Sequence, residues 1–229
     1  MEEAPLLPFE NMESDYQKLL HLDQNSAPIL RFYQWQERSA TYGYFLDPAD
    51  YLLPGHLSIA RRPTGGGIIF HDYDLSFSLL VPASHPCYST NTLQNYAFVN
   101  YCLRAAFKKF HPLLPIHLFS CKGECRPRFC MAGATIYDLI VDGKKMVGGA
   151  MRKTSKGFLH QGSICLRLPD RQFFTAALKN PALAEEMEKQ SYPLLQGHAA
   201  SEYEEQRAYL KHCIAESFTS VQTNPFILC

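Results

Sequence analysis

The sequence lacks an excess of charge of either sign, a long apolar run and an N-terminal targeting pattern. Among its 229 residues, 22 Lys and Arg balance 22 Asp and Glu, so the formal net charge is zero. A general binder of nucleic acid or of anionic membranes needs a clustered excess of Lys and Arg. No run approaches the roughly 18 apolar residues of a membrane-spanning helix, and the acidic N-terminus does not resemble a signal peptide. We therefore expect a cytoplasmic protein that binds neither nucleic acid nor membrane.

The eight cysteines lack the close pairs that usually bind structural zinc. Cys121, Cys125 and Cys130 follow a C-x3-C-x4-C pattern, and no matching second pair occurs elsewhere. We expect no metal site, and we expect thiols rather than disulfides because disulfides are rare in the cytoplasm. A thiolate nucleophile within this cluster is possible only if a cation or a helix N-terminus lowers its pKa. From the residues alone, a structural role for each cysteine remains the alternative.

Two periodicities alternate along the chain, and together they predict an α+β fold with a mixed or antiparallel sheet core flanked by helices. Helical spacing occurs at 12–23, 92–110, 172–179, 181–190 and 202–219. Extended segments are expected at 29–36, 40–46, 57–62, 68–71, 75–81, 135–141, 144–150 and 158–167. The dipeptide Asp142-Gly143 predicts a tight hairpin turn between 135–141 and 144–150.

The segment Arg61-Arg62-Pro63-Thr64-Gly65-Gly66-Gly67 is the first candidate binding site. Three consecutive glycines allow the backbone to approach a ligand closely and to aim several N–H groups at it. The two arginines add positive charge that does not titrate, so the segment suits a phosphate or a carboxylate. It matches neither a P-loop nor a dinucleotide-binding fingerprint. A tight turn beside a solvated arginine pair remains the alternative.

Two further segments carry candidate side chains. Lys145 precedes Gly148, Gly149 and Ala150, and a lysine on a half-buried strand can hold a carbonyl or phosphate oxygen. The alternative is a surface lysine after a hairpin turn. In the second segment, His160 is a candidate to line a pocket, and a purely structural histidine is the alternative.

The order of these motifs resembles the biotin/lipoate protein ligase superfamily, and within it the branch of lipoate–protein ligase A and octanoyltransferases. The matching segments are LRFYQW, RRPTGGGIIFHD, YDLIVDGKKMVGGAMR and FLHQGSICL, from about residue 28 to about residue 168. The resemblance implies a catalytic domain like those of class II aminoacyl-tRNA synthetases and biotin ligases. It also implies attachment of a lipoyl or octanoyl group to one lysine of a carrier domain, either a lipoyl domain of a 2-oxoacid dehydrogenase or the H protein of glycine cleavage.

The resemblance also assigns roles to individual residues. Lys145 matches the catalytic lysine of the family, and Gly148 follows it at the usual spacing. His160 and Gly162 correspond to an adjacent His-Gly pair, which Gln161 interrupts in this chain. The residues that match the acyl- and adenylate-binding segments are Arg61, Arg62, Thr64, Gly65, Gly66, Gly67, His71, Gly148, Gly149, Ala150, His160 and Gly162.

Two mechanisms fit this resemblance. A ligase uses ATP and Mg²⁺ to convert lipoate or octanoate to an acyl adenylate, whereas a transferase takes octanoate from acyl carrier protein through a cysteine thioester. The GGG loop followed by IIFHD is typical of ligases, while LRFYQW and Cys130 in C-x6-Y-D-L are typical of transferases. We expect the ligase slightly ahead, with no tightly bound cofactor. A non-catalytic acyl-binding member of the fold is a third alternative.

The resemblance also suggests a division of the chain. We expect a catalytic domain at 1–170 and a helical extension at 171–229 that packs on the same domain. This extension is shorter than the accessory domain that bacterial ligases usually carry, so a second chain could supply that part.

Overall fold

A four-stranded antiparallel sheet runs through the centre of the computed structural model, which describes residues 4–120 and 134–223. Its strand order is β1-β5-β10-β9, and two smaller sheets have the orders β3-β2-β4 and β6-β7-β8. The strands are β1 (Ile29–Phe32), β2 (Ser39–Tyr42), β3 (Ser58–Arg61), β4 (Ile68–His71), β5 (Asp74–Pro82), β6 (His117–Leu118), β7 (Leu139–Val141), β8 (Lys144–Lys145), β9 (Val147–Thr154) and β10 (Gly157–Cys165). Since β2 pairs with β3 in parallel, the fold confirms the predicted α+β class with mixed sheets.

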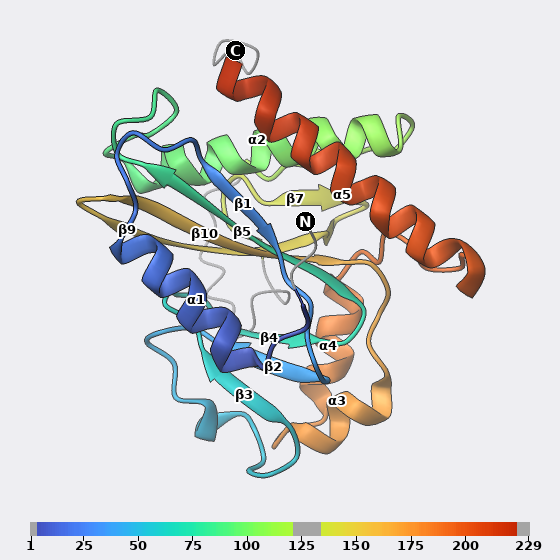
Figure 1. Cartoon of the computed structure of the whole chain (residues 1–229). Coiled ribbons are helices and arrows are strands. Elements are labelled where there is room, and N and C mark those ends of the chain that lie inside the picture. Colours follow the sequence, from blue (N-terminus) through green and yellow to red (C-terminus); the bar gives the residue numbers. More distant parts are fainter. Residues whose placement is uncertain (1–3, 121–133, 224–229) are drawn as a thin grey trace.

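Helices cover both faces of the central sheet (Figure 1). One face carries α2 and α5, which pack against each other, and the opposite face carries α1. Helices α3 and α4 lie beside the β3-β2-β4 sheet. The helices are α1 (Pro8–Leu20), the short 3-10 helix η1 (Pro48–Asp50), α2 (Thr92–Phe110), α3 (Arg171–Ala177), α4 (Ala182–Gln190) and α5 (Ala200–Thr223). No helix in the described ranges is long and apolar enough to cross a membrane.

The two faces of the central sheet differ in composition. On β5, Leu75, Phe77 and Leu79 are buried in the main apolar core beneath α2 and α5. The alternate residues Ser76 and Ser78 point to the α1 face and are also buried. Because successive side chains of a strand point to opposite faces, one strand contributes to an apolar core and to a polar layer.

Helix α2 covers the predicted range 92–110, while α1 differs from the prediction. The spacing predicts a helix at 12–23 with Tyr16, Leu19 and Leu20 on one apolar face. The helix instead spans Pro8–Leu20, Leu20 is 42% exposed, and the buried face includes Met12 and Asp15. The helix turns these residues inward because the sheet offers polar partners to Asp15. The burial of a carboxylate on this face could not be expected from apolar spacing.

The predicted hairpin at Asp142-Gly143 is present, with positive φ angles of 50° and 76°. Both residues adopt the left-handed conformation that a two-residue hairpin turn requires. The partner strand is shorter than the predicted 144–150, since β8 comprises only Lys144 and Lys145. The chain leaves this sheet at the buried Met146 and enters the central sheet as β9. Lys145 therefore lies where the chain passes from one sheet to another.

Candidate active site

Lys145 is buried at this crossing and forms an ion pair. Its side chain is 5% exposed, and its Nζ lies 2.7 Å from Oδ2 of Asp138, which is fully buried. The backbone carbonyl of Lys145 accepts a hydrogen bond from the N–H of Tyr192 at 2.8 Å, which joins β8 to the segment after α4. Removing either partner would leave an uncompensated buried charge, so each group depends on the other for its place in the buried site.

Asp138 accepts several hydrogen bonds besides the ion pair. The backbone N–H and the hydroxyl of Thr135 donate to Oδ2 at 2.6 and 3.1 Å. The hydroxyl of Tyr96, on α2, donates to Oδ1. The preceding residue, Tyr137, has a φ of 72°, a conformation that non-glycine residues adopt rarely. Strained backbone of this kind persists where the surrounding contacts demand it and is frequent at functional sites.

The glycine loop is held from inside by Arg62. This arginine is 3% exposed, and its guanidinium donates to the backbone carbonyl of Thr41 at 2.9 Å and to those of Gly65 and Gly67 at 3.1 and 2.6 Å. Gly66 has a φ of 89°, so the turn requires a residue without a side chain. Arg62 therefore shapes the loop, while its neighbour Arg61 is exposed and stacks on the ring of Tyr44.

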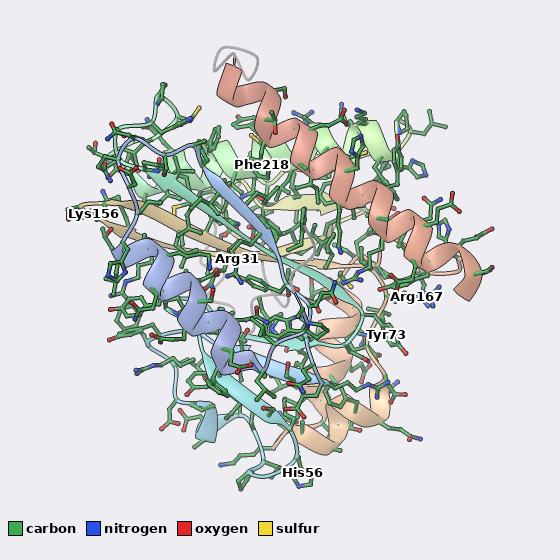
Figure 2. The ribbon with its side chains drawn as sticks, in the orientation of Figure 1. Arg31, His56, Tyr73, Lys156, Arg167 and Phe218 are labelled. Atoms are coloured by element: carbon green, nitrogen blue, oxygen red, sulfur yellow. The ribbon has the colours of Figure 1, made fainter. Side chains whose placement is uncertain are left out.

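Gln161 joins the glycine loop to the α1 face of the sheet. Its Oε1 accepts a hydrogen bond from the hydroxyl of Thr64 at 2.8 Å, and its Nε2 donates to Asp15 at 2.9 Å. Asp15 also accepts bonds from Arg31, Tyr33 and Ser78, and it forms an ion pair with Arg31. Arg31 lies between the sheet and α1 (Figure 2). This buried network connects α1, β1, β5 and β10 to the loop.

His160 points to the opposite face of the sheet from Gln161. Its ring stacks on Phe77, with ring centroids 5.8 Å apart, and contacts the ring of Tyr96 on α2. Burial lowers the pKa of His160 to about 3, so the ring is neutral at pH 7. Neither ring nitrogen has a hydrogen-bond partner within the described ranges. In place of the His-Gly pair implied by the resemblance, the interrupting Gln161 faces the glycine loop.

His71 closes the strand that follows the glycine loop and belongs to a second polar cluster. One ring nitrogen lies 3.0 Å from Asp74 Oδ2, the other lies 2.9 Å from the hydroxyl of Thr41, and the ring stacks on Trp35. Burial raises the pKa of Asp74, but the charge of His71 and hydrogen bonds from His71, Ser76 and Ser163 outweigh it and lower the pKa overall.

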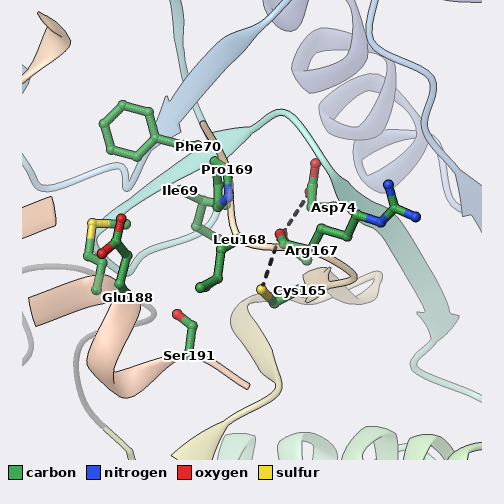
Figure 3. A pocket seen from close by; sticks show the side chains of 11 residues that line it. Ile69, Phe70, Asp74, Cys165, Arg167, Leu168, Pro169, Glu188 and Ser191 are labelled. Carbon is green, nitrogen blue, oxygen red and sulfur yellow. Dashed lines mark hydrogen bonds between the residues drawn. The ribbon is translucent and has the colours of Figure 1, made fainter. Parts of the chain in front are cut away.

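Two small cavities flank Ile69 and Ser163. One cavity has a volume of about 10 Å³ and lies next to the glycine loop. The residues that line it include Arg62, His71 and Gln161. The other, of about 40 Å³, is largely apolar and lies between β4, the end of β10 and α4 (Figure 3). Phe70 lines the larger cavity, whereas Ile68 and Val147 lie in two separate apolar clusters.

A wider hollow of about 500 Å³ opens between α1 and β3. Arg61 and Arg152 line it, and both guanidinium groups lie over the ring of Tyr44, at 4.7 and 5.2 Å from its centroid. Arg152 also donates to the carbonyl of Pro63 at 3.1 Å, so it is attached to the glycine-rich segment. This side of the loop presents cationic groups to a ligand that approaches from outside.

The cysteines of the described ranges are Cys87, Cys102, Cys165 and Cys213, and all four are unpaired, as expected. Burial, reinforced by the charge of Asp74, raises the pKa of Cys165 to about 12, which makes this thiol a poor nucleophile. Cys121, Cys125 and Cys130, including the predicted nucleophile, lie outside the described residues.

The predicted site residues thus fall into two groups on opposite faces of the central sheet. The α1 side holds the glycine loop, Arg62 and His71. Gly149 and His160 lie on the α2 face, and Lys145, on β8 beside that face, is joined to α2 through Asp138 and Tyr96. Sequence reasoning missed the residues that position these groups: Asp15, Arg31, Tyr33, Asp74, Tyr96, Asp138, Arg152 and Gln161. A carboxylate directly before a strand of apolar residues was the available signal for Asp138.

The fold and these motifs define a catalytic domain of the biotin/lipoate ligase superfamily, in its lipoate ligase and octanoyltransferase branch. Residues 7–201 match the family model described as the lipoyl protein ligase A/B catalytic domain, and the chain belongs to this family.

Individual proteins agree with this assignment. The chain is 29% identical over 199 residues to octanoyltransferase LipM of Macrococcus caseolyticus, covering 81% of this chain and 72% of the relative. Across eight relatives named octanoyltransferase LipM, the chain spans between 57% and 72% of the relative's length.

Two solved structures share the fold. A T. acidophilum protein described as a lipoate protein ligase with bound lipoic acid has a TM-score of 0.68 at 21% identity, covering 96% of this chain and 87% of that chain. A lipoate-protein ligase A bound with ATP has a TM-score of 0.67 at 20% identity, covering 96% of this chain and 86% of that chain.

Proposed function

We propose that the protein is an octanoyltransferase that moves an octanoyl group from acyl carrier protein to a lysine of a lipoyl domain. The observation that carries this proposal is the similarity to octanoyltransferase LipM over 81% of the chain. The likeness to lipoate ligases at 20–21% identity supports the shared fold. The transferase is therefore placed ahead of the ligase, whereas the glycine loop alone slightly favours the ligase.

In this reaction, Cys130 is the acyl acceptor. Its thiolate attacks the carbonyl carbon of the octanoyl thioester, the bond to the carrier sulfur breaks, and the carrier leaves as a thiol after gaining a proton. The neutral amine of the target lysine then attacks the Cys130 thioester. The new amide bond replaces the bond to sulfur, and the amine proton passes to the departing thiolate.

Lys145 supplies positive charge to this chemistry. The buried ammonium group, held by Asp138 at 2.7 Å, stabilises negative charge that develops on the thioester carbonyl oxygen or on the sulfur. A charge held in place within a buried site costs no reorganisation during the reaction. We assign the glycine loop, shaped by Arg62, to binding of the acyl donor through its backbone N–H groups.

The acceptors that fit this proposal are lipoyl domains of 2-oxoacid dehydrogenases or the glycine cleavage H protein. We assign the acyl chemistry to residues 1–170 and treat 171–229 as an extension of the same domain. The cationic hollow at Arg61 and Arg152 is on the accessible side of the glycine loop, where an acidic carrier could approach.

An acylation assay with four donors tests the proposal: octanoyl carrier protein, octanoate with ATP, lipoate with ATP, and lipoyl-AMP. We expect transfer from octanoyl carrier protein without ATP, and an octanoyl adduct on Cys130 detectable by mass spectrometry. The Cys130→Ser variant should lose at least about 1,000-fold in transfer rate, because an alcohol is a far weaker nucleophile than a thiolate. Cys121→Ser is the matched control and should retain activity. Full transfer by Cys130→Ser would contradict the mechanism.

The ligase reaction is the second candidate, and the GGG-IIFHD segment favours it. In that case Gly65–Gly67 and Arg61 would meet the phosphate of an acyl adenylate, and ATP with Mg²⁺ would supply the activation energy. Strict dependence on ATP with free octanoate or lipoate would replace the transferase with this ligase. Absence of transfer with all four donors would favour a non-catalytic acyl-binding protein.

A further inference from the structure

The carboxylate that holds Lys145 is itself held from helix α2. Oδ2 of Asp138 lies 2.7 Å from the Lys145 ammonium, and Oδ1 accepts a hydrogen bond from the Tyr96 hydroxyl at 2.5 Å. The two carboxylate oxygens are thus divided between the lysine and the tyrosine. A carboxylate fixed at both oxygens cannot rotate about its terminal bond without breaking one of these contacts.

Tyr96 is placed for this contact by the start of α2. The side chain of Asn91 caps the helix by accepting from Leu93 N–H at 2.9 Å. The side chain of Asn95 bonds both the N–H and the carbonyl of Ser89, at 2.7 and 2.8 Å, and secures the segment that leads into the helix. These contacts fix the first turn of α2, and Tyr96 follows this turn directly.

The opposite side of Tyr96 is confined by β9 and β10. Its ring lies against the neutral ring of His160, with centroids 5.5 Å apart. A Cβ at Gly149 would lie 3.0 Å from the Tyr96 hydroxyl and 3.0 Å from Cε1 of His160. The absence of a side chain at Gly149 therefore makes room for the hydroxyl at the place where it meets Asp138.

We propose that Tyr96 is a positioning residue for Lys145, acting through Asp138, and that Gly149 is a glycine because it accommodates the Tyr96 hydroxyl. This inference rests on the proposed function, in which Lys145 contributes charge to acyl transfer. Tyr96 does not touch the substrate in this role. The Tyr96 hydroxyl fixes the Asp138 carboxylate, which in turn fixes the Lys145 ammonium group. Removing the hydroxyl therefore changes the position of this positive charge during the reaction.

The test is Tyr96→Phe, which keeps the ring against His160 and removes only the hydroxyl. We expect kcat for octanoyl transfer to fall roughly tenfold, with the KM values for the donor and acceptor carriers unchanged within about twofold. The matched control is Tyr88→Phe, because the ring of Tyr88 also stacks on a neighbour and its hydroxyl has no hydrogen bond in the described part of the chain. This control should retain kcat.

A double-mutant cycle shows whether Tyr96 affects kcat through Asp138 or independently of Asp138. If Tyr96 acts through Asp138, Tyr96→Phe combined with Asp138→Asn should be no slower than Asp138→Asn alone. Losses that multiply, or an unchanged kcat in Tyr96→Phe, would overturn the inference. A lowered Tm with unchanged kcat would assign Tyr96 a purely structural role and would overturn it too.

Labelling of Lys145 with an amine-reactive ester tests the position of the ammonium without measuring turnover. Tyr96→Phe should increase the labelling rate of Lys145 several-fold relative to the exposed Lys144, which serves as an internal standard. An unchanged ratio would contradict the positioning role even in an inactive protein. Failure of wild-type transfer from octanoyl carrier protein without ATP would instead refute only the transferase proposal.

Discussion

The two faces of the central sheet solve different physical problems with the same strands. Beneath α2 and α5, Phe77, Leu79 and Ile164 pack in an apolar core, with the ion pair of Lys145 beside it. Beneath α1, the alternate residues of the same strands form a layer of hydrogen bonds around Asp15. The difference shows how a strand carries two kinds of information: one set of alternate positions specifies packing, and the other contributes to a polar network that holds the glycine loop.

This comparison also explains the separation of His160 and Gln161. They are consecutive on β10, and therefore face opposite sides of the sheet. His160 is enclosed by aromatic rings and stays neutral, whereas Gln161 bridges Thr64 and Asp15. An amide suits this bridge because it accepts at one atom and donates at another, whichever protonation state its neighbours adopt.

The largest expected effect tests the polar α1 face. Asp15→Ala removes the carboxylate that pairs with the buried Arg31 and that accepts bonds from Tyr33, Ser78 and Gln161. We expect a loss of about 3–5 kcal/mol in the free energy of unfolding, the usual cost of breaking a buried pair. Urea unfolding followed by circular dichroism measures it. Glu13→Ala, on the same helix and exposed, is the control. A loss below 1 kcal/mol would contradict the importance of this network.

A smaller effect tests the apolar face at Gly162. A Cβ there would lie 2.3 Å from Cε1 of Phe77, which is fully buried, so Gly162→Ala must displace this ring. We expect a loss of about 1–3 kcal/mol in the free energy of unfolding, as for other overpacked cores. Gly65→Ala is the control, because a Cβ at Gly65 meets nothing within 4 Å. Equal stability of the two variants would remove the packing explanation for Gly162.

The smallest expected effect is a pH dependence of the free energy of unfolding that comes from His160 on the apolar face. The pKa of His160 is lowered by burial to about 3, against an ordinary value of 6.5, so the unfolded chain binds a proton between these values and the folded chain does not. The stability associated with His160 is therefore complete above pH 6.5 and falls with decreasing pH toward 3. At pH 5 the loss is roughly 2 kcal/mol.

Chemical unfolding at pH 7.5 and pH 5 in wild type and His160→Leu measures this difference. The variant should lose less stability than wild type over this interval, because leucine does not titrate. His56→Leu, at a histidine on the exposed surface, should keep the wild-type pH dependence. Identical slopes in wild type and His160→Leu would show that His160 does not remain neutral in the folded protein.

Local sequence patterns were sufficient to predict those elements whose geometry depends mainly on their own residues. Helix α2, strand β4 and the Asp142-Gly143 turn lie where spacing and turn chemistry predict them. The boundaries of β8 and β9 were not predictable, since the break at Met146 depends on two sheets competing for one stretch of chain. The polar face of α1 was also hidden, because Asp15 stands among polar residues in the sequence and resembles a surface residue until its partners are known.

For the site, the sequence by itself determined the family and indicated the glycine loop and the lysine as candidates, because backbone freedom and charge can be read from residue type alone. Tertiary structure decided what each one contacts. It turned Arg62 inward to shape the loop, gave Gln161 the place facing that loop, and brought Tyr96 from α2 to Asp138. The physical reason is that residue type and spacing act along the chain, whereas burial and hydrogen bonding depend on which distant segments meet.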